Sequence, residues 1–188
     1  LLDEGVCMRE ETIKVLRKVP ELTLYFWMIK IAATTLGETA GDALSMSLNL
    51  GYVLSSIIFL GFFIVFVIAQ IRAKIFHAPL YWLTIIATTT LGTTVADFVD
   101  RSLGLGYFGG SLILRSLLLT SLAAWYISCG RISVDHVNDP KSETFYWVTI
   151  MFSQTLGTAL GDWTADTHGL GYLGAAALFG SALLFLIV

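Results

Sequence analysis

One sequence unit occurs three times in this chain, and the repetition constrains the fold more than any other feature. The copies align without gaps on three tryptophans, Trp27, Trp82 and Trp147. In each copy Leu-Gly begins nine residues after the tryptophan, an aspartate lies fifteen residues after it, and Leu-Gly-Tyr begins twenty-three residues after it. The aspartates are Asp42, Asp97 and Asp162. This shared register predicts three copies of one supersecondary unit that pack against each other.

Each copy contains two apolar segments of helical length. The first segments are predicted at residues 22–47, 81–102 and 143–166, and the second at residues 51–70, 106–128 and 170–188. Each segment is long enough to cross a hydrocarbon core of ~30 Å, which takes about 20 residues. Leu-Gly-Tyr leaves almost no loop between the two segments, so the chain is expected to turn back sharply at its glycine.

The composition favours a membrane as the surrounding solvent. Hydrophobic residues make up 56 % of the chain and charged residues 13 %, with a mean hydropathy of +0.78. Soluble domains usually carry about 25 % charged residues. We therefore predict an all-α integral membrane protein, a bundle of three tandem parallel helical hairpins with six transmembrane helices. The predicted units are an N-terminal segment, 1–19, and three hairpin regions, 20–74, 75–130 and 131–188.

Basic residues predict the orientation of these helices. Lysines and arginines are concentrated in the N-terminal segment and in the two longer connections, whereas the tight turns carry only Arg101. By the positive-inside rule the N-terminus and the longer connections are cytoplasmic. We predict a multi-pass protein of the cytoplasmic (inner) membrane, with the lipid bilayer as its partner. Because no Lys/Arg cluster forms a basic surface, no nucleic-acid partner is expected.

The first helix of each copy carries two stripes at helical spacing. Small residues four apart, such as Gly37 and Gly41, predict close contact between helices. A polar stripe lies beside them and consists of Thr35, Glu38 and Asp42, then Thr90, Thr93 and Asp97, then Thr155, Thr158 and Asp162. At ~1.5 Å per residue, the aspartates lie about 22 Å beyond the tryptophans, still at hydrocarbon depth. Ionisable groups at that depth mark function by default, although aspartates repeated in every copy could equally staple the hairpins together.

Residues that differ between the copies are sharper functional candidates. Glu38 has threonines at the equivalent positions of the other copies, so only the first copy has this carboxylate near the midplane. Arg115 is predicted near the midplane as well and is expected to pair with Asp97 or Glu38, because an arginine at that depth needs a partner. Whether such a pair serves function or structure alone stays open.

Signals for metal sites and enzymes are weak or missing. Asp162, Asp166 and His168 could supply ligands to a divalent cation near an outer turn, although they match no recognised metal motif. The sequence contains no His-Glu-x-x-His, no Gly-x-Ser-x-Gly and no phosphate-binding glycine loop. We therefore expect no catalytic residues, no enzymatic activity and no cofactor.

The repeat resembles a bacterial membrane-protein family of tandem repeats of unknown function, known as uncharacterised membrane-anchored proteins. The resemblance rests on residues 18–27, on 34–38 and on Gly41-Asp42, and it extends over residues 18–188. It implies two transmembrane segments and one characteristic tryptophan per repeat. Family members usually have four repeats, so the resemblance implies a further hairpin after Val188. It implies no activity.

The leading functional prediction is a small-solute carrier or channel, most plausibly for a cation. Its polar lining would consist of Glu38, Asp42, Thr93, Asp97, Arg115, Thr158 and Asp162. One alternative is a non-catalytic membrane scaffold that binds a lipid or a protein, and another is an intramembrane metal-dependent enzyme at Asp162, Asp166 and His168. A homo-oligomer also stays open.

Overall fold

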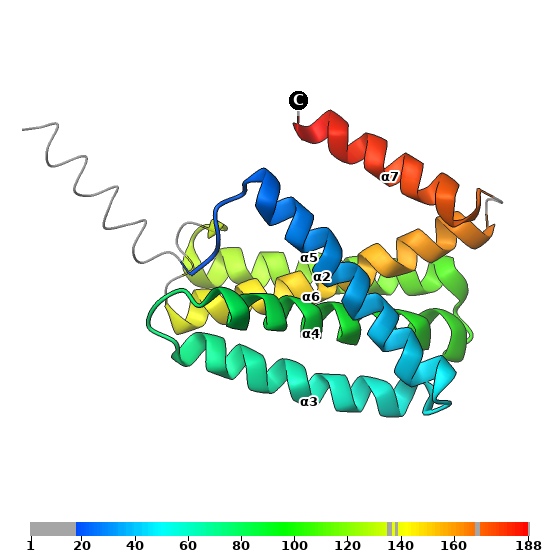
Figure 1. Ribbon diagram of the computed structural model, residues 1–188, viewed down its shortest axis with the longest axis horizontal. Coiled ribbons are helices and arrows are strands. Elements are labelled where there is room, and N and C mark those ends of the chain that lie inside the picture. The colour runs from blue at the N-terminus through cyan, green and yellow to red at the C-terminus, as the bar shows by residue number, and fades with distance from the viewer. Residues whose placement is uncertain (1–17, 135–136, 138, 168–169, 188) are drawn as a thin grey trace, which may run out of the picture.

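The computed structural model describes residues 18–134, 137, 139–167 and 170–187, and all regular structure in those residues is helical. Six α-helices appear in chain order: α2 (Leu24–Asp42), α3 (Gly51–Arg72), α4 (Ala78–Asp97), α5 (Gly106–Cys129), α6 (Pro140–Asp162) and α7 (Gly171–Ile187). The tight turns between paired helices gather at one end of the bundle, and the longer connections lie at the other (Figure 1). The predicted pattern of three two-helix units is therefore present.

Each first helix ends in a feature that periodicity did not predict. Directly after the repeated aspartate the backbone widens into a short π-helical segment: η1 (Ala43–Ser47), η2 (Phe98–Ser102) and η4 (Trp163–Thr167). The hydrogen bonds Leu48 N to Ala43 O, at 2.9 Å, and Leu103 N to Phe98 O, at 3.2 Å, span five residues as a π-helix requires. Adding these segments extends the first helices to residues 47, 102 and 167, close to the predicted ends.

Local signals explain where the helices begin and turn. Pro79 and Pro140 lie in the first turns of α4 and α6, where a missing N–H costs no hydrogen bond. Asp139 caps α6 by accepting hydrogen bonds from the backbone N–H groups of Lys141 and Ser142. The glycine of each Leu-Gly-Tyr turn has a φ between 64° and 74°, a left-handed conformation that favours glycine.

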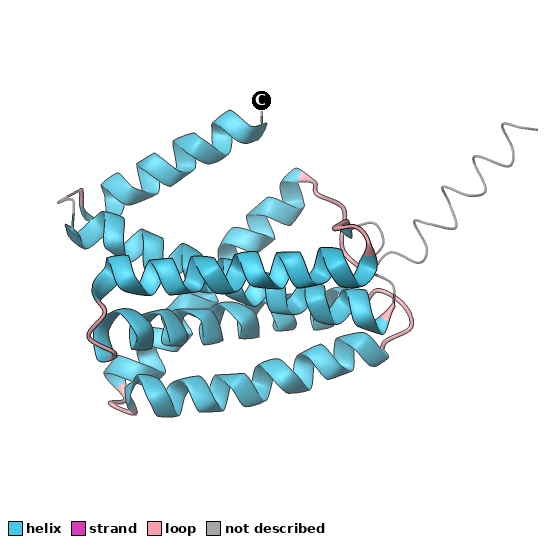
Figure 2. Ribbon diagram, turned by 180° about the vertical axis from the view of Figure 1, so that it is seen from behind, coloured by secondary structure: helices cyan, strands magenta, loops and turns pink. Residues whose placement is uncertain are grey.

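The two helices of one copy hardly pack on each other beyond their turn. Instead, α3 packs along α4 and α5 along α6, so the second helix of a copy lies against the first helix of the next copy. The first helices also pack in series, α2 on α4 and α4 on α6. Helix α7 touches the bundle mainly near its start and then projects away from it (Figures 1 and 2). The packing unit therefore combines helices from successive copies.

The core surrounds α4. In its most apolar stretch 67 % of the residues of α4 are buried, against 11 % in α3 and 17 % in α5. An aromatic cluster fills the end with the longer connections, where the Tyr81 and Tyr146 hydroxyls lie 2.9 Å apart beside Trp147. Lys18 forms an ion pair with Glu143 at the same end, and both side chains are buried. That contact ties the described start of the chain to α6.

Six spanning helices were predicted, and in the described residues three helices are long and apolar enough to cross a membrane: Gly51–Arg72, Ala78–Ser102 and Gly106–Cys129. Helix α7 contains a shorter apolar stretch, Gly171–Phe185. The outward faces of α3 and α5 consist of exposed large hydrophobic side chains, including Ile57, Val65, Leu119 and Ile127. This distribution, apolar outside and polar around α4, suits a helical bundle in lipid.

Candidate functional site

Acidic side chains from all three first helices line one cavity of about 280 Å³. Its carboxylates are Glu38 and Asp42 from α2, Asp97 from α4 and Asp162 from α6. They come together because the polar stripes of α2, α4 and α6 turn toward each other where these helices pack in series. Thr93, Thr158, Tyr172, Met46 and Arg101 complete the lining. The structure thus brings together six of the seven residues predicted for a polar lining.

Arg101 is the basic residue of this cavity. Its guanidinium lies 3.3 Å from Asp97 Oδ1 and 3.0 Å from Asp162 Oδ2, so it bridges α4 and α6. It also donates a long hydrogen bond of 3.4 Å to the Tyr52 hydroxyl. Because Asp97 lies four residues before Arg101, the helical spacing of this pair was visible in the sequence. Its role was missed because Arg101 was counted with the tight turn and not with the polar stripe.

Thr93 leaves one hydrogen-bonding atom of the cavity lining unused. Its side chain is 2 % exposed, and its hydroxyl oxygen has no hydrogen-bond partner among the described residues. The methyl side of Thr93 faces the position that a Cβ on Gly41 would occupy, so the close approach of α2 and α4 holds the residue in place. A buried hydroxyl without a partner is costly, and a bound ligand or water would satisfy it.

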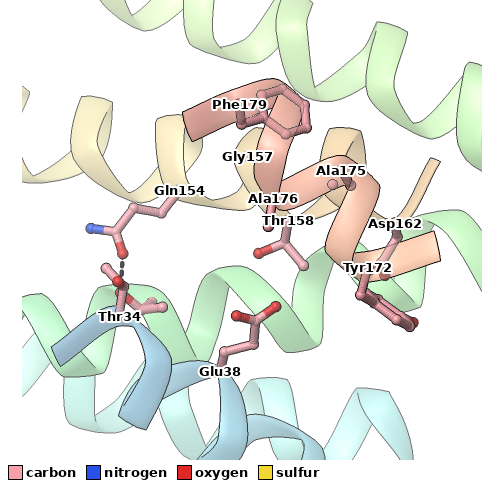
Figure 3. A pocket seen from close by; sticks show the side chains of 12 residues that line it. Thr34, Glu38, Gln154, Gly157, Thr158, Asp162, Tyr172, Ala175, Ala176 and Phe179 are labelled. Atoms are coloured by element: carbon pink, nitrogen blue, oxygen red, sulfur yellow. Dashed lines mark hydrogen bonds between the residues drawn. The ribbon is translucent and has the colours of Figure 1, made fainter. Parts of the chain in front are cut away.

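A second cavity of about 340 Å³ adjoins the acidic cavity and lies between α2, α6 and α7. The two cavities share Glu38, Thr158, Asp162 and Tyr172. Figure 3 shows the Glu38 carboxylate directed across this space toward Thr158. Further along, Gln154 is held by Thr88 and Thr89 of α4, donating to the Thr88 hydroxyl at 3.1 Å and accepting from Thr89. Polar side chains therefore recur along this face of α6, at Gln154, Thr158 and Asp162.

Arg115 lies apart from the acidic side chains, and its expected pairing with Asp97 or Glu38 is not found in the described residues. Its side chain is exposed and lines a separate, mostly apolar cavity of about 380 Å³ with Phe108 and Trp163. The preceding residue, Leu114, is buried in a cluster with Ala159 of α6. The predicted depth along α5 gave no information about which face of the helix Arg115 occupies.

Asp100 lies one turn from Asp97 but faces a different helix. It is 6 % exposed, and neither carboxylate oxygen has a hydrogen-bond partner in the described chain. Its side chain fills the space above Gly110 of α5, where a Cβ would collide with Oδ1. The equivalent pairs in the other copies are Ser45 with Ser55 and Ala165 with Ala175. Asp100 is therefore not part of the cavity lining.

The suggested metal ligands do not form a complete group in the described residues. The Asp166 carboxylate accepts a hydrogen bond of 2.6 Å from the Tyr107 hydroxyl, and Asp162 is bound by Arg101. His168 lies outside the described residues. Within those residues no set of three or more His, Cys, Asp and Glu side chains is placed to hold a metal ion.

Three segments of the chain match the family described as Repeat of Unknown Function (DUF347), one in each copy: residues 25–76, 80–130 and 145–188. The chain belongs to this family. Each repeat thus contributes one helix with a polar stripe, and the apolar second helix of the first and second repeats packs on the repeat that follows. No curated protein and no solved structure gives a significant match. The geometry of the site is therefore the basis for a functional argument.

Proposed function

We propose that this protein spans the membrane as a helical bundle and that the acidic cavity binds and passes a small cation. The observation that carries the proposal is the convergence of four carboxylates from three different helices around one cavity whose basic residue is Arg101. Carboxylate and hydroxyl oxygens are the ligands that hard cations and ammonium groups prefer. In a low-dielectric bundle such an excess of negative charge attracts cations and repels anions.

The arrangement also suggests how a cation would be handled. Asp97 and Asp162 are engaged by Arg101, whereas Glu38 and Asp42 have no ion-pair partner among the described residues. Glu38 lies where the two cavities join, so a cation at Glu38 would be in contact with both spaces. The free Thr93 hydroxyl would supply a neutral oxygen ligand. Glu38 and Asp42 are therefore the proposed binding carboxylates, with Asp97 and Asp162 held at one edge by Arg101.

The proposal is tested by cation flux into proteoliposomes that contain the purified full chain. A panel of monovalent and divalent cations is offered with and without a pH gradient. Glu38→Gln and Asp42→Asn should each reduce saturable flux at least about tenfold, because each removes the charge of a proposed binding carboxylate and such an interaction is worth ~1.4 kcal/mol or more. Asp100→Asn is the matched control, since it removes a buried carboxylate one turn away that faces α5. Equal flux in all variants would contradict the proposal.

A second candidate, a membrane scaffold that binds another helix, is favoured by one further observation. Small residues of α2 and α4 are covered by the next first helix: a Cβ on Gly37 would meet Thr89 at 2.8 Å, and one on Gly92 would meet Thr155 at 3.0 Å. The equivalent Gly157 and Gly161 of α6 have nothing within 4 Å. This face of α6 therefore has room for a further helix that presents a threonine side chain, as α4 presents Thr89 to α2.

The scaffold reading is tested with a labelled peptide of residues 140–167, which carries such a face at Thr155. It should bind the intact protein in detergent and lose binding to Gly157→Leu, whose side chain would fill the groove. A peptide in which Thr155 is replaced by leucine serves as the control. If the wild-type protein does not bind the peptide, the scaffold candidate is rejected and the cation proposal is unaffected.

A further inference from the structure

The largest cavity among those described lies at the opposite end of the bundle from the repeated aspartates, close to the longer connections. It measures about 600 Å³ and is bounded by the first turns of α2, the end of α5 and the start of α6. Most of its lining is aromatic or aliphatic, including Phe26, Trp27, Trp125 and Ile150. Cavities of this size with apolar walls and a few polar groups are typical ligand sites. The acidic cavity accounts for none of these residues.

Lys30 is the charged residue in this lining. Its side chain is half-buried. The ion pairs among the described residues involve Lys18 and Arg101, and none of them includes Lys30. An ammonium group among aromatic rings without a counter-ion is costly in a bundle surrounded by lipid. A bound anion would remove that cost.

The tyrosine pair adds a second donor to the same cavity. Tyr81 and Tyr146 both line it, and their hydroxyls lie 2.9 Å apart. Two hydroxyls that share one hydrogen bond use one hydrogen, so the other O–H stays available to donate. No further acceptor for it is recorded within the described residues. The residues that line the cavity therefore include an ammonium group and a hydroxyl hydrogen, and neither has an acceptor within the described residues.

We propose that this cavity binds an anionic lipid, with its acidic head at Lys30 and the tyrosine pair and its acyl chain along the aromatic wall. The inference rests on the membrane placement proposed above but not on cation transport. The anion follows from the two donors, and the lipid follows from the apolar lining and from the position between helices of a membrane bundle. Lys30 precedes Glu38 by eight residues, or ~12 Å along α2, so the lipid head and the acidic cavity are separate sites.

The test is lipid binding to the purified full chain, measured by native mass spectrometry. The probes are dioleoyl phosphatidylglycerol, dioleoyl phosphatidylcholine and inorganic phosphate. The wild type should bind phosphatidylglycerol more tightly than phosphatidylcholine. Lys30→Gln should weaken phosphatidylglycerol binding about fivefold, the effect expected for one basic contact, and should leave phosphatidylcholine binding unchanged. Lys30→Arg keeps the charge and should retain the preference.

Two further variants separate the site from general effects of charge and stability. Lys74→Gln removes an exposed lysine from a connection at the same end and should retain wild-type lipid preference. Ser153→Phe, at an exposed position of the cavity lining, should fill the cavity and weaken both lipids while Lys30 remains. An unchanged preference in Lys30→Gln would overturn the proposal. Inorganic phosphate binding as tightly as phosphatidylglycerol would overturn the assignment to lipid, since no acyl chain would then be needed.

Discussion

Helices α4 and α6 carry the same repeat pattern but lie in different surroundings. Helix α4 is enclosed by α2, α3 and α6, whereas α6 packs on α4 and α5 and leaves one small-residue face open. Thr155 presses on Gly92, while the equivalent Gly157 has no neighbour within 4 Å of a Cβ position. The comparison shows that the repeated glycines form a helix-packing surface that each copy offers to the next. It also explains why the polar stripes of α2, α4 and α6 line one cavity, since these helices pack on each other in series.

The comparison is tested most sharply by placing the same large side chain at Gly92 and at Gly157. Gly92→Leu should destabilise the protein by about 3 kcal/mol, since α6 backbone and side-chain atoms occupy the space it needs. Gly157→Leu should lie within about 0.5 kcal/mol of the wild type, because that space is empty. Unfolding in detergent, followed by circular dichroism, measures both. Similar losses in both variants would show that α6 is covered as α4 is.

A second comparison concerns the Asp100–Gly110 pair and its equivalent, Ala165–Ala175. Gly110→Ala should cost about 2 kcal/mol, because its methyl group meets the Asp100 carboxylate. The double variant Asp100→Ala/Gly110→Ala reproduces the third copy and should recover most of that loss, as contacting residues couple. The same unfolding assay applies. Additive losses in the double variant would mean that the two positions do not share one space.

The smallest expected effect distinguishes the starts of α6 and α4. Asp139 caps α6, whereas His77 at the start of α4 makes no side-chain cap. Asp139→Ala should cost about 1 kcal/mol at neutral pH and His77→Ala much less. The hydrogen bond from Ser142 lowers the pKa of Asp139, so its contribution is present above the unfolded-state pKa and is lost as the pH falls through the lower folded-state value. As the pH is lowered from 7, the free energy of unfolding of the wild type should therefore fall toward that of Asp139→Ala.

The repeat predicted the six helices and their ends to within a few residues because periodicity and turn glycines are local signals. It could not predict that α3 packs on α4 and α5 on α6, because neighbour choice depends on how side chains interlock. The acidic and hydroxyl side chains of the cavity lining were predictable from the sequence, but its basic residue, Arg101, was not. Arg115 was predicted to pair with Asp97 or Glu38 but lies on another face, and Arg101 was overlooked because its approach to Asp162 joins two helices.

The buried pair of Lys18 and Glu143 was missed for a similar reason. Lys18 belongs to a run of charged residues that indicates a solvated segment, and only the fold brings it to α6. The π-helical segments after the aspartates carry no periodic signal of their own, because five residues are too few to change a helical pattern. What the sequence lacked in each case was long-range geometry.

The most direct test of the central claim, an acidic cavity accessible to cations, is the rate at which a cysteine inside it reacts. Thr158→Cys is made in a chain whose Cys7 and Cys129 are replaced by serine, and Leu103→Cys in the exposed turn is the reference. Positively and negatively charged methanethiosulfonate reagents are compared at both positions. Relative to Leu103→Cys, we predict at least about a tenfold preference for the cationic reagent at Thr158→Cys, reduced by Asp162→Asn. No reaction at Thr158→Cys, or the same charge ratio as at Leu103→Cys, would contradict the account.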